Sequence, residues 1–323
     1  MREIQFREAL REAMQEEMRT DSTVFLIGEE VAEYNGAYKV SQGMLDEFGP
    51  ERVIDTPIAE LGFGGISVGA AASGLRPIVE FMTFNFSLVA IDQVINSASK
   101  IMSMSGGQYS CPIVFRGPTG NAGQLSSQHS SNFENWFANT PGLKVVYPAF
   151  PYDAKGLLCQ AFEDTNPVIF FEHKGLYRSI SGQVPTDFYT VPFGKAQLIR
   201  TGSQFTIVTY GLGVHWAMDY LNEHPEQEAD LIDLRTLLPL DMETIYASVK
   251  KTGRVVVLHE DSLTGGIGGE IAARIGEDCF EHLDAPVVRC ASLDTPIPFN
   301  AELEKNFLAN RYLGQSIDKL LRY

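Results

Sequence analysis

Residues 55–100 constrain the fold of this chain more than any other stretch, because they place one acidic side chain in front of a helix that has almost no bulk. The acid is Glu60, and it lies between a strand-like turn and the expected helix. Small side chains allow another backbone to approach a helix closely. The small residues here are Gly62, Gly64, Gly65, Ser67, Gly69, Ala70, Ala71, Ala72, Ser73 and Gly74.

An apolar strand and a patch of aromatic residues follow this helix. After a break at residues 76–77, the sequence predicts a strand over residues 78–82, and a second helix starts near Leu88. The aromatic residues around the turn are Phe81, Phe84 and Phe86. A carboxylate beside a tightly packed helix, with aromatic rings across the turn, indicates a cleft for a flat heteroaromatic ligand.

Alternating strand and helix patterns along the whole chain predict an α/β fold with two doubly wound, mainly parallel sheets. The expected strands are 24–28, 52–54, 78–82, 111–116, 143–147, 168–171, 206–210, 230–233, 255–258 and 287–290. The expected helices are 4–20, 41–49, 152–162, 213–223, 241–250 and 267–280. We expect one domain at residues 1–178, a Pro- and Gly-broken linker at 179–193, and a second domain at 194–323.

Charge, hydropathy and cysteine spacing exclude several classes of binding partner and metal site. The formal net charge of −16 argues against nucleic acid, whose phosphates need a basic face, and it favours a basic protein partner or a generic acidic surface. No apolar run is long enough to span a bilayer, so no membrane association is expected. The charged amphipathic start at residues 1–18 is unlike a signal peptide, and a cytoplasmic location is therefore expected. The four cysteines form no CxxC pair, which favours buried thiols over a zinc site.

Long phrases of this sequence resemble one enzyme family. They cover nearly the whole chain and read LIGEEVAEYNGAYKVSQGM, DTPIAELGFGGISVGAA, GLRPIVEFMTFNFS, AIDQVINSASK, CPIVFRGP, SSQHS, PGLKVVYP, LDMETI and SVKKTGR. They are similar to the β subunits of thiamine-diphosphate-dependent 2-oxo acid dehydrogenases, most closely the pyruvate type. The resemblance implies a pyrimidine-type thiamine diphosphate domain followed by a transketolase C-terminal-like domain. It also implies oxidative decarboxylation of pyruvate and reductive acetylation of lipoyl, jointly with an α subunit.

The resemblance assigns Glu60 as the activating acid. In the family, this carboxyl hydrogen-bonds a ring nitrogen of the aminopyrimidine and so drives deprotonation of the thiazolium carbon. Phe86 matches the aromatic that packs on the pyrimidine, and Ile58 and Met82 match residues that line the same pocket. From the residues alone, the spacing favours an acid stabilised by the helix dipole for Glu60, and core packing for the other three. Glu29 and Glu30 end an expected strand, and either approach the cofactor or lie in a solvated loop.

His129 lies in a long loop over residues 117–137 and matches an active-site histidine of the family. The resemblance implies proton transfer or hydrogen bonding as the acyl group passes to lipoyl. A solvated loop histidine is the alternative. The family also implies a potassium ion held mainly by carbonyl oxygens, and an Asp- and Asn-capped turn is the alternative there. The positions that match the potassium ligands are Ile113, Ala161, Phe162, Asp164 and Asn166.

One missing motif points to a shared active site. Thiamine enzymes hold magnesium and the diphosphate near a GDG segment, and GDG occurs nowhere in this chain. The resemblance therefore implies an α subunit that holds magnesium, an α2β2 heterotetramer, and a dihydrolipoyl acyltransferase core that docks on the acidic second domain.

Three other functions stay open from the sequence. IFFEHKGLYR, DLRTLLPLD and HEDSLTGG look closer to a branched-chain 2-oxo acid or acetoin dehydrogenase, whereas EFMTFNFS looks closer to the pyruvate type. A non-catalytic scaffold subunit is a second alternative. An NAD enzyme would rest on Gly211 and Gly213 alone, where Trp216 replaces the third glycine. The glycines at 265–269 favour a tight helix start at a subunit interface over a phosphate site, and the sequence leaves the role of His259 open.

Overall fold

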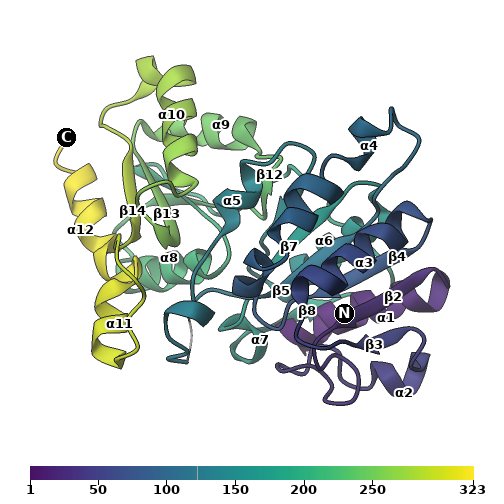
Figure 1. Ribbon diagram of the computed structural model, residues 1–323. Coiled ribbons are helices and arrows are strands. Elements are labelled where there is room, and N and C mark those ends of the chain that lie inside the picture. Colours follow the sequence, from purple (N-terminus) through teal and green to yellow (C-terminus); the bar gives the residue numbers. More distant parts are fainter. Residues whose placement is uncertain (122) are drawn as a thin grey trace. The chain divides into compact units, whose positions relative to one another are not determined.

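The computed structural model describes residues 1–121 and 123–323, which form two compact units. Unit 1 comprises residues 1–119 and 136–193, and unit 2 comprises residues 120–135 and 194–323. Ala122, within the expected long loop, lies outside the described residues. Each unit carries helices on a mainly parallel sheet (Figure 1), which confirms the predicted α/β class. The expected domain limits stay a prediction.

In unit 1 the parallel strands lie in the order β6-β7-β5-β4-β2-β3. They are β2 (Val24–Gly28), β3 (Val53–Asp55), β4 (Arg76–Glu80), β5 (Val114–Thr119), β6 (Lys144–Val146) and β7 (Val168–His173). Every residue of β2, β5 and β7 is buried, as expected for parallel strands covered on both faces. Gly28 permits the close approach of β2 to β4, because a Cβ there would lie 2.4 Å from the Glu80 carbonyl oxygen.

Helices and short turns cover this sheet. They are α1 (Phe6–Thr20), α2 (Met44–Phe48), α3 (Glu60–Ala72), η1 (Phe84–Leu88), η2 (Gln93–Ala98), α4 (Ile101–Met104), α6 (Pro151–Glu163) and α7 (Leu176–Ser179). Helix α5 (Glu134–Ala138) begins in unit 2, which contains Glu134 and Asn135, and continues in unit 1. Helices α1 and α6 are joined by the buried Lys155, whose ammonium lies 2.6 Å from a Glu16 carboxylate oxygen. β1 (Arg2–Gln5) pairs antiparallel with β8 (Ser181–Val184), which lies inside the expected linker.

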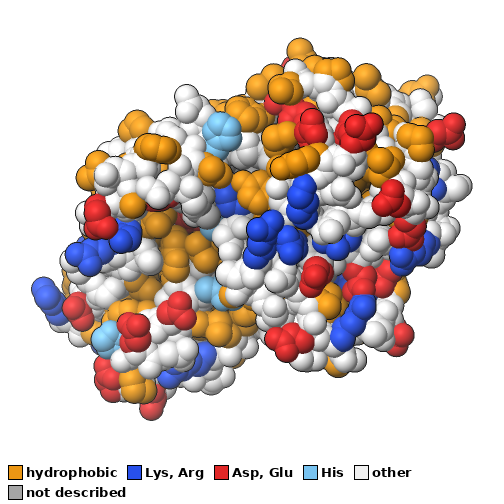
Figure 2. Space-filling model, turned by 90° about the horizontal axis from the view of Figure 1, so that it is seen from below, with side chains coloured by type: hydrophobic (Ala, Val, Ile, Leu, Met, Phe, Trp, Pro, Cys, Tyr) orange, Lys and Arg blue, Asp and Glu red, His pale blue; other side chains and the backbone are white. Residues whose placement is uncertain are grey.

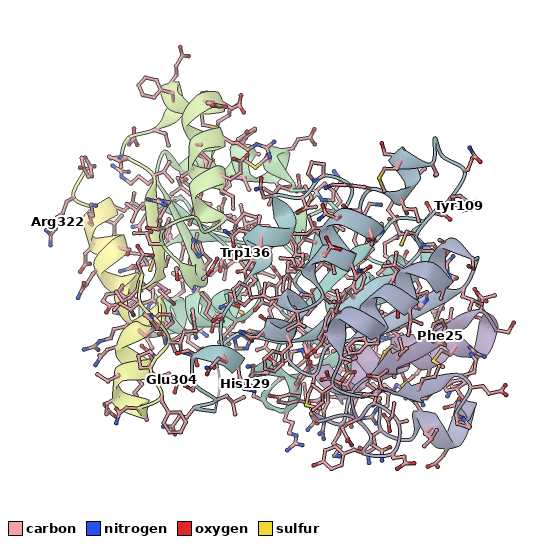
Figure 3. All side chains as sticks on the ribbon, in the orientation of Figure 1. Phe25, Tyr109, His129, Trp136, Glu304 and Arg322 are labelled. Atoms are coloured by element: carbon pink, nitrogen blue, oxygen red, sulfur yellow. The ribbon has the colours of Figure 1, made fainter. Side chains whose placement is uncertain are left out.

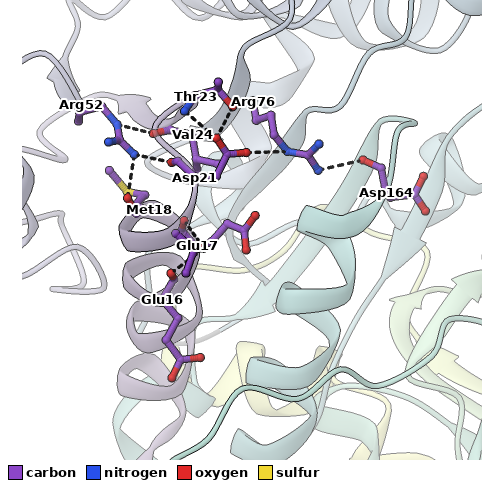
Figure 4. A network of polar contacts seen from close by, with 10 residues as sticks. Glu16, Glu17, Met18, Asp21, Thr23, Val24, Arg52, Arg76 and Asp164 are labelled. Atoms are coloured by element: carbon purple, nitrogen blue, oxygen red, sulfur yellow. Dashed lines mark hydrogen bonds and ion pairs between the residues drawn. The ribbon is translucent and has the colours of Figure 1, made fainter.

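Arginine side chains close the C-terminal end of α1 (Figure 4). The Arg52 guanidinium donates hydrogen bonds to the carbonyl oxygens of Met18, at 3.0 Å, and Asp21, at 3.0 Å. These contacts satisfy carbonyls that a helix end leaves without intrahelical partners. Arg76 reaches from Asp21 to the Asp164 carbonyl oxygen, and so links α1 to the segment that follows α6.

The expected helix near Leu88 is a 3₁₀ turn, η1, followed by a π-helical turn, η2. Polar side chains favour the 3₁₀ turn η1. Ser87 Oγ donates to the Phe84 carbonyl oxygen at 2.6 Å, and Thr83 Oγ1 donates to Asn85 Oδ1 at 3.1 Å. Such local bonds compete with the regular helical pattern.

In unit 2 the strands lie in the order β14-β13-β10-β11-β9. They are β9 (Gln197–Arg200), β10 (Phe205–Thr209), β11 (Ala229–Asp233), β13 (Val255–Ser262) and β14 (Val288–Ser292), and only β9 is antiparallel to its neighbour. The remaining elements are η3 (Ser127–His129), α8 (Leu212–Glu223), β12 (Thr236–Leu238), α9 (Met242–Thr252), α10 (Gly268–Asp278), η4 (Phe280–His282), α11 (Ala301–Phe307) and α12 (Asn310–Leu320).

The C-terminal helices α11 and α12 were not expected from the sequence. Helix α12 buries Leu313, Ile317 and Leu320 in the same apolar core as Leu231 and Leu258 of the sheet, and so covers unit 2 on one side. Within the described part of the chain, no helix combines the length and apolar character needed to cross a membrane.

Candidate functional site

The carboxyl ends of β3, β2 and β4 gather the residues of the candidate site in unit 1. These strands are neighbours in the sheet, with Gly28 opposite both Asp55 and Glu80. Open α/β sheets bind ligands at this edge. Glu29 directly follows β2, Glu60 begins α3 after β3, and Met82 follows β4.

The Asp55 carboxylate fixes the chain around this edge. It accepts hydrogen bonds from the backbone N–H groups of Ala32, at 2.7 Å, and Glu33, at 3.0 Å. The segment that follows β2 is therefore tied to the end of β3. As a result Glu29 is buried, while Glu30 is exposed with a positive φ of 58°. The solvated-loop alternative is thus wrong for Glu29.

Glu29 and Glu60 form a buried pair of acids. Each side chain is about 95% buried, with exposed fractions of 4% and 5%, and the two carboxyl groups share a hydrogen bond. Burial, and then the charge of Glu60 and this hydrogen bond, raise the pKa of Glu29 to about 7. The other oxygen of Glu29, Oε1, is buried without a hydrogen-bond partner. The pair therefore holds one proton near neutral pH and keeps a polar atom available to a ligand.

The aromatic patch divides into core residues and residues that remain partly accessible. Phe81 stacks on Phe115 with 6.1 Å between ring centroids, and Phe84 lies 4.5 Å from Phe171, so both are core residues. Phe86 is half-buried. Met82 is also half-buried, whereas Ile58 is 83% exposed. Of the residues expected to line the pocket, only Glu60 is fully enclosed within this chain.

Helix α3 has one packed face and one open face. A Cβ on Gly64 would lie 3.3 Å from the Ala90 Cβ, so this glycine lets α3 approach the segment before η2. On the open face, Leu61 is 51% exposed and Ile66 is 67% exposed. Exposed hydrophobic side chains also lie among acidic and basic ones on the face seen in Figure 2. An apolar, glycine-rich helix face is the kind of surface that another protein covers.

His129 lies in unit 2, at the end of η3, and its side chain is exposed (Figure 3). Ser127, in the same turn, donates a 2.7 Å hydrogen bond from Oγ to the Ile297 carbonyl oxygen. Glu60 belongs to unit 1, so the two expected catalytic residues lie in different compact units.

The positions expected to bind potassium surround the turn after α6. The Ile113 carbonyl oxygen accepts a hydrogen bond from Val168 N–H at 2.9 Å. The Ala161 carbonyl oxygen accepts one from Asp164 N–H at 3.3 Å. Asp164 Oδ1 accepts the backbone N–H of Asn166 at 2.9 Å, which is the Asp- and Asn-capped turn of the alternative. The carbonyl of Phe162 belongs to the last turn of α6.

Asp164 already has a cationic partner, because its carboxylate pairs with the Lys144 ammonium. Burial opposes ionisation here, but the hydrogen bonds from Lys144 and Asn166 prevail and lower the pKa of Asp164. Among the described residues, no three His, Cys, Asp or Glu side chains are placed to hold a metal ion. A cation at this turn would therefore depend on carbonyl oxygens.

Two glycine motifs of unit 2 serve packing. A Cβ on Gly213 would lie 2.2 Å from Thr209 Oγ1, so this glycine lets α8 begin against β10. In the second motif, Cβ atoms on Gly266 and Gly268 would lie 2.5 Å and 2.6 Å from the His259 ring. The loop at 265–269 thus encloses His259, and burial lowers the pKa of that imidazole to about 4.

A buried ionic cluster in unit 1 was missed by sequence reasoning. Arg116 of β5 is completely buried and donates from Nε to Glu172 at 2.6 Å, while its Nη1 pairs with Glu80. Tyr177 donates a 2.7 Å hydrogen bond to Glu172. The apolar segment CPIVFR contained only one signal for this cluster, a charged residue inside a strand that is otherwise apolar.

Two family models match this chain. The transketolase pyrimidine-binding domain matches residues 2–179, and the transketolase C-terminal domain matches residues 194–311. Among solved structures, a split-gene transketolase described as an inactive beta4 tetramer superposes with a TM-score of 0.78 at 23% identity. That alignment covers 99% of this chain and 98% of the other, and it establishes the fold.

Curated relatives give the more specific match. Three are pyruvate dehydrogenase E1 component subunits beta, from Rhizobium meliloti (strain 1021), Rickettsia felis and Rickettsia bellii. They are 53%, 52% and 52% identical over 94%, 94% and 96% of this chain. The matched regions span 66%, 93% and 96% of the respective relatives. The chain therefore belongs to the family of pyruvate dehydrogenase E1 component β subunits, with a transketolase pyrimidine-binding domain followed by a transketolase C-terminal domain.

Proposed function

We propose that this chain is the catalytic β subunit of a pyruvate dehydrogenase decarboxylase component. Together with an α subunit it decarboxylates pyruvate oxidatively and acetylates a lipoyl group. The observation that carries the proposal is the buried Glu29–Glu60 pair at the carboxyl edge of the first sheet. A buried acid with a second acid beside it controls the position of one proton, which is what acid–base catalysis requires.

Thiamine diphosphate fits this site. When bound, it supplies the nucleophilic carbon that attacks a 2-oxo acid. Glu60 would hydrogen-bond the pyrimidine, and the buried, unpartnered Glu29 Oε1 marks a polar position that a ligand can satisfy. Phe86 and Met82, both half-buried, and Ile58 would pack against the ring and exclude water from it. The protein thus binds and orients the ring, and the hydrogen-bonded Glu29–Glu60 pair provides the acid beside it.

We further propose that the α subunit covers the open face of α3 and holds magnesium and the diphosphate, in an α2β2 heterotetramer. The exposed Leu61 and Ile66 support this, as does the absence of GDG from the sequence. The acyltransferase core would dock on the acidic domain at 194–323, with residues 179–193 as the linker after the domain at 1–178. Potassium at Ile113, Ala161, Phe162, Asp164 and Asn166 belongs to the same proposal, as does a cytoplasmic location.

Pyruvate is the proposed substrate, and the names of the relatives support it. Of the three Phe side chains in EFMTFNFS, Phe86 would restrict the size of the substrate, because Phe81 and Phe84 pack in the core. A branched-chain 2-oxo acid remains the competing substrate on the basis of the C-terminal phrases.

With reconstituted α subunit, we expect kcat/KM for pyruvate to exceed that for 2-oxoisovalerate by about tenfold or more, the discrimination that a few methyl groups give in an apolar pocket. Steady-state turnover with each acid, at saturating lipoyl acceptor, measures this ratio. Faster turnover of 2-oxoisovalerate would assign the chain to the branched-chain type instead.

His129→Ala is expected to lower acetyl transfer to lipoyl about 100-fold, because a positioned imidazole contributes roughly this factor to a proton transfer. Binding of thiamine diphosphate should be nearly unchanged. Acetyl-lipoyl formation and cofactor titration of the αβ enzyme give the two numbers. His282→Ala is a matched control, since His282 is also an exposed histidine of a 3₁₀ turn in unit 2. Equal losses in transfer and in cofactor binding would contradict the role of His129.

A further inference from the structure

Asn121 and residues 123–135 of the same chain lie at the carboxyl edge of the second sheet. Tyr210 directly follows β10, and Glu260 lies in the C-terminal half of β13, the strand next to it. The Asn121 N–H donates to Glu260 Oε1 at 2.6 Å, and the Tyr210 hydroxyl donates to Glu134 Oε1 at 2.6 Å. Both hydrogen bonds are buried. They hold the two ends of one segment to adjacent strands.

Other contacts follow the same segment. Ser127 bonds to the Ile297 carbonyl, as described above, and Asn135 Nδ2 donates to the Gly265 carbonyl. Gly265 belongs to the loop that encloses His259. The exposed His129 lies between the two buried anchors, eight residues after Asn121 and five before Glu134. The His129 imidazole therefore belongs to a loop whose two ends are hydrogen-bonded to unit 2, while His129 itself is exposed.

Glu134, which holds one end of the loop, lies beside two other acids, Asp261 and Glu260. The side chain is completely buried, and its second oxygen has no hydrogen-bond partner. Burial, and then the neighbouring Asp261, raise the pKa of Glu134 well above its usual value. The pKa of the Asp261 carboxyl is also raised, to about 7, first by burial and then by the charges of Glu260 and Asp294. The protonated form of Glu134 is therefore favoured over that of an ordinary glutamate, and its Oε1 accepts the Tyr210 hydroxyl.

We propose that Glu134 and Glu260 are positioning residues for His129: the buried bonds at Tyr210 and Asn121 fix both ends of its loop on unit 2 and so present the imidazole in one place. The inference rests on the proposed role of His129 in acetyl transfer. Doubly wound sheets commonly bind ligands at their carboxyl edge. In unit 2 this edge binds a loop of the same chain instead.

The test uses the reconstituted αβ enzyme and four variants. Glu134→Val removes the acceptor, Tyr210→Phe removes the donor almost isosterically, and Glu134→Gln keeps a neutral acceptor. Glu281→Gln is the control, because Glu281 is an exposed acid of unit 2. Amide hydrogen exchange over residues 121–134 and the kcat and KM of acetyl transfer are measured.

We expect Glu134→Val and Tyr210→Phe to speed exchange in residues 121–134 about tenfold, the factor for loss of one buried hydrogen bond. The kcat of acetyl transfer should fall by a similar factor, with KM for pyruvate unchanged. Glu134→Gln should keep both the exchange rate and the kcat close to those of the wild-type enzyme. Unchanged exchange in Glu134→Val and Tyr210→Phe overturns the proposal. Faster exchange with unchanged transfer also overturns it. If His129→Ala still lowers transfer, only the positioning role fails; if it does not, the role of His129 fails as well.

A pH series on the wild-type enzyme gives a second measurement that needs no variant of the anchor. The ionisable groups around Glu134 are Tyr210, Glu260 and Asp261, and those around Asp261 and His259 include Asp294 and Arg289. Burial raises the pKa of Asp261, a β13 neighbour of Glu134, from 3.8 to about 7. The buried arrangement of acids that receives Glu134 is therefore most stable below pH 3.8 and weakens as pH rises to about 7. Exchange, corrected for its intrinsic rate, should therefore be faster at pH 7.5 than at pH 5.5, and less so in Asp261→Asn. A flat profile contradicts docking through these acids.

Discussion

Glu60→Gln, assembled with the α subunit, is expected to lose pyruvate decarboxylation by about 100- to 10,000-fold, the range for removal of a positioned acid or base. The amide can accept and donate hydrogen bonds, so the ring is still held, but it cannot take up or release the proton. Cofactor affinity should therefore change far less than turnover.

Turnover at saturating thiamine diphosphate and titration of the cofactor separate these two effects. Glu30→Gln is the matched control, since Glu30 directly follows the buried Glu29 but is exposed. We expect it to retain wild-type turnover. Undiminished decarboxylation by Glu60→Gln would support the alternative of a non-catalytic scaffold subunit and would remove the basis of the proposed mechanism.

The fold could be predicted because its signals are local. The unbroken apolar run of β2 and the apolar strands of unit 2 indicate buried parallel sheets, and the predicted limits of β2 are those of the structure. The 3₁₀ turn after β4 could not be predicted, because it depends on which serine and threonine hydroxyls bond to backbone carbonyl oxygens. Helix α12 was missed although its apolar residues have helical spacing.

The site could be predicted only in part, for a related reason. The position of Glu60 at a helix start is visible in the sequence, but its pairing with Glu29 depends on the adjacency of β2 and β3 in space. Likewise, the sequence does not distinguish Phe81 and Phe84, which pack in the core, from Phe86, which is half-buried. The two ends of the His129 loop meet strands that lie about 80 to 140 residues further along the chain. Contacts of this kind leave no local pattern.

The largest expected effect on stability comes from Arg116→Met. The guanidinium is completely buried among the carboxylates of Glu80 and Glu172, and Tyr177 donates to Glu172 as well. Burial disfavours the charge of Arg116, but the two carboxylates prevail and raise its pKa. Methionine fills similar space without a charge, and so leaves two buried acids without their cation. Removing one partner of such a cluster costs about 3–5 kcal/mol.

Urea unfolding of the purified chain measures this loss as a lower midpoint. Arg19→Met is the matched control, because Arg19 pairs with Glu47 at the surface and its side chain is 52% exposed. A surface pair contributes about 0–1 kcal/mol, so this control should unfold near the wild-type midpoint. Adding Glu80→Gln and Glu172→Gln to Arg116→Met should recover part of the loss, since the orphaned charges are then gone. If Arg116→Met unfolds no earlier than Arg19→Met, the buried cluster does not stabilise the sheet that positions Glu60, and the site must be held by apolar packing alone.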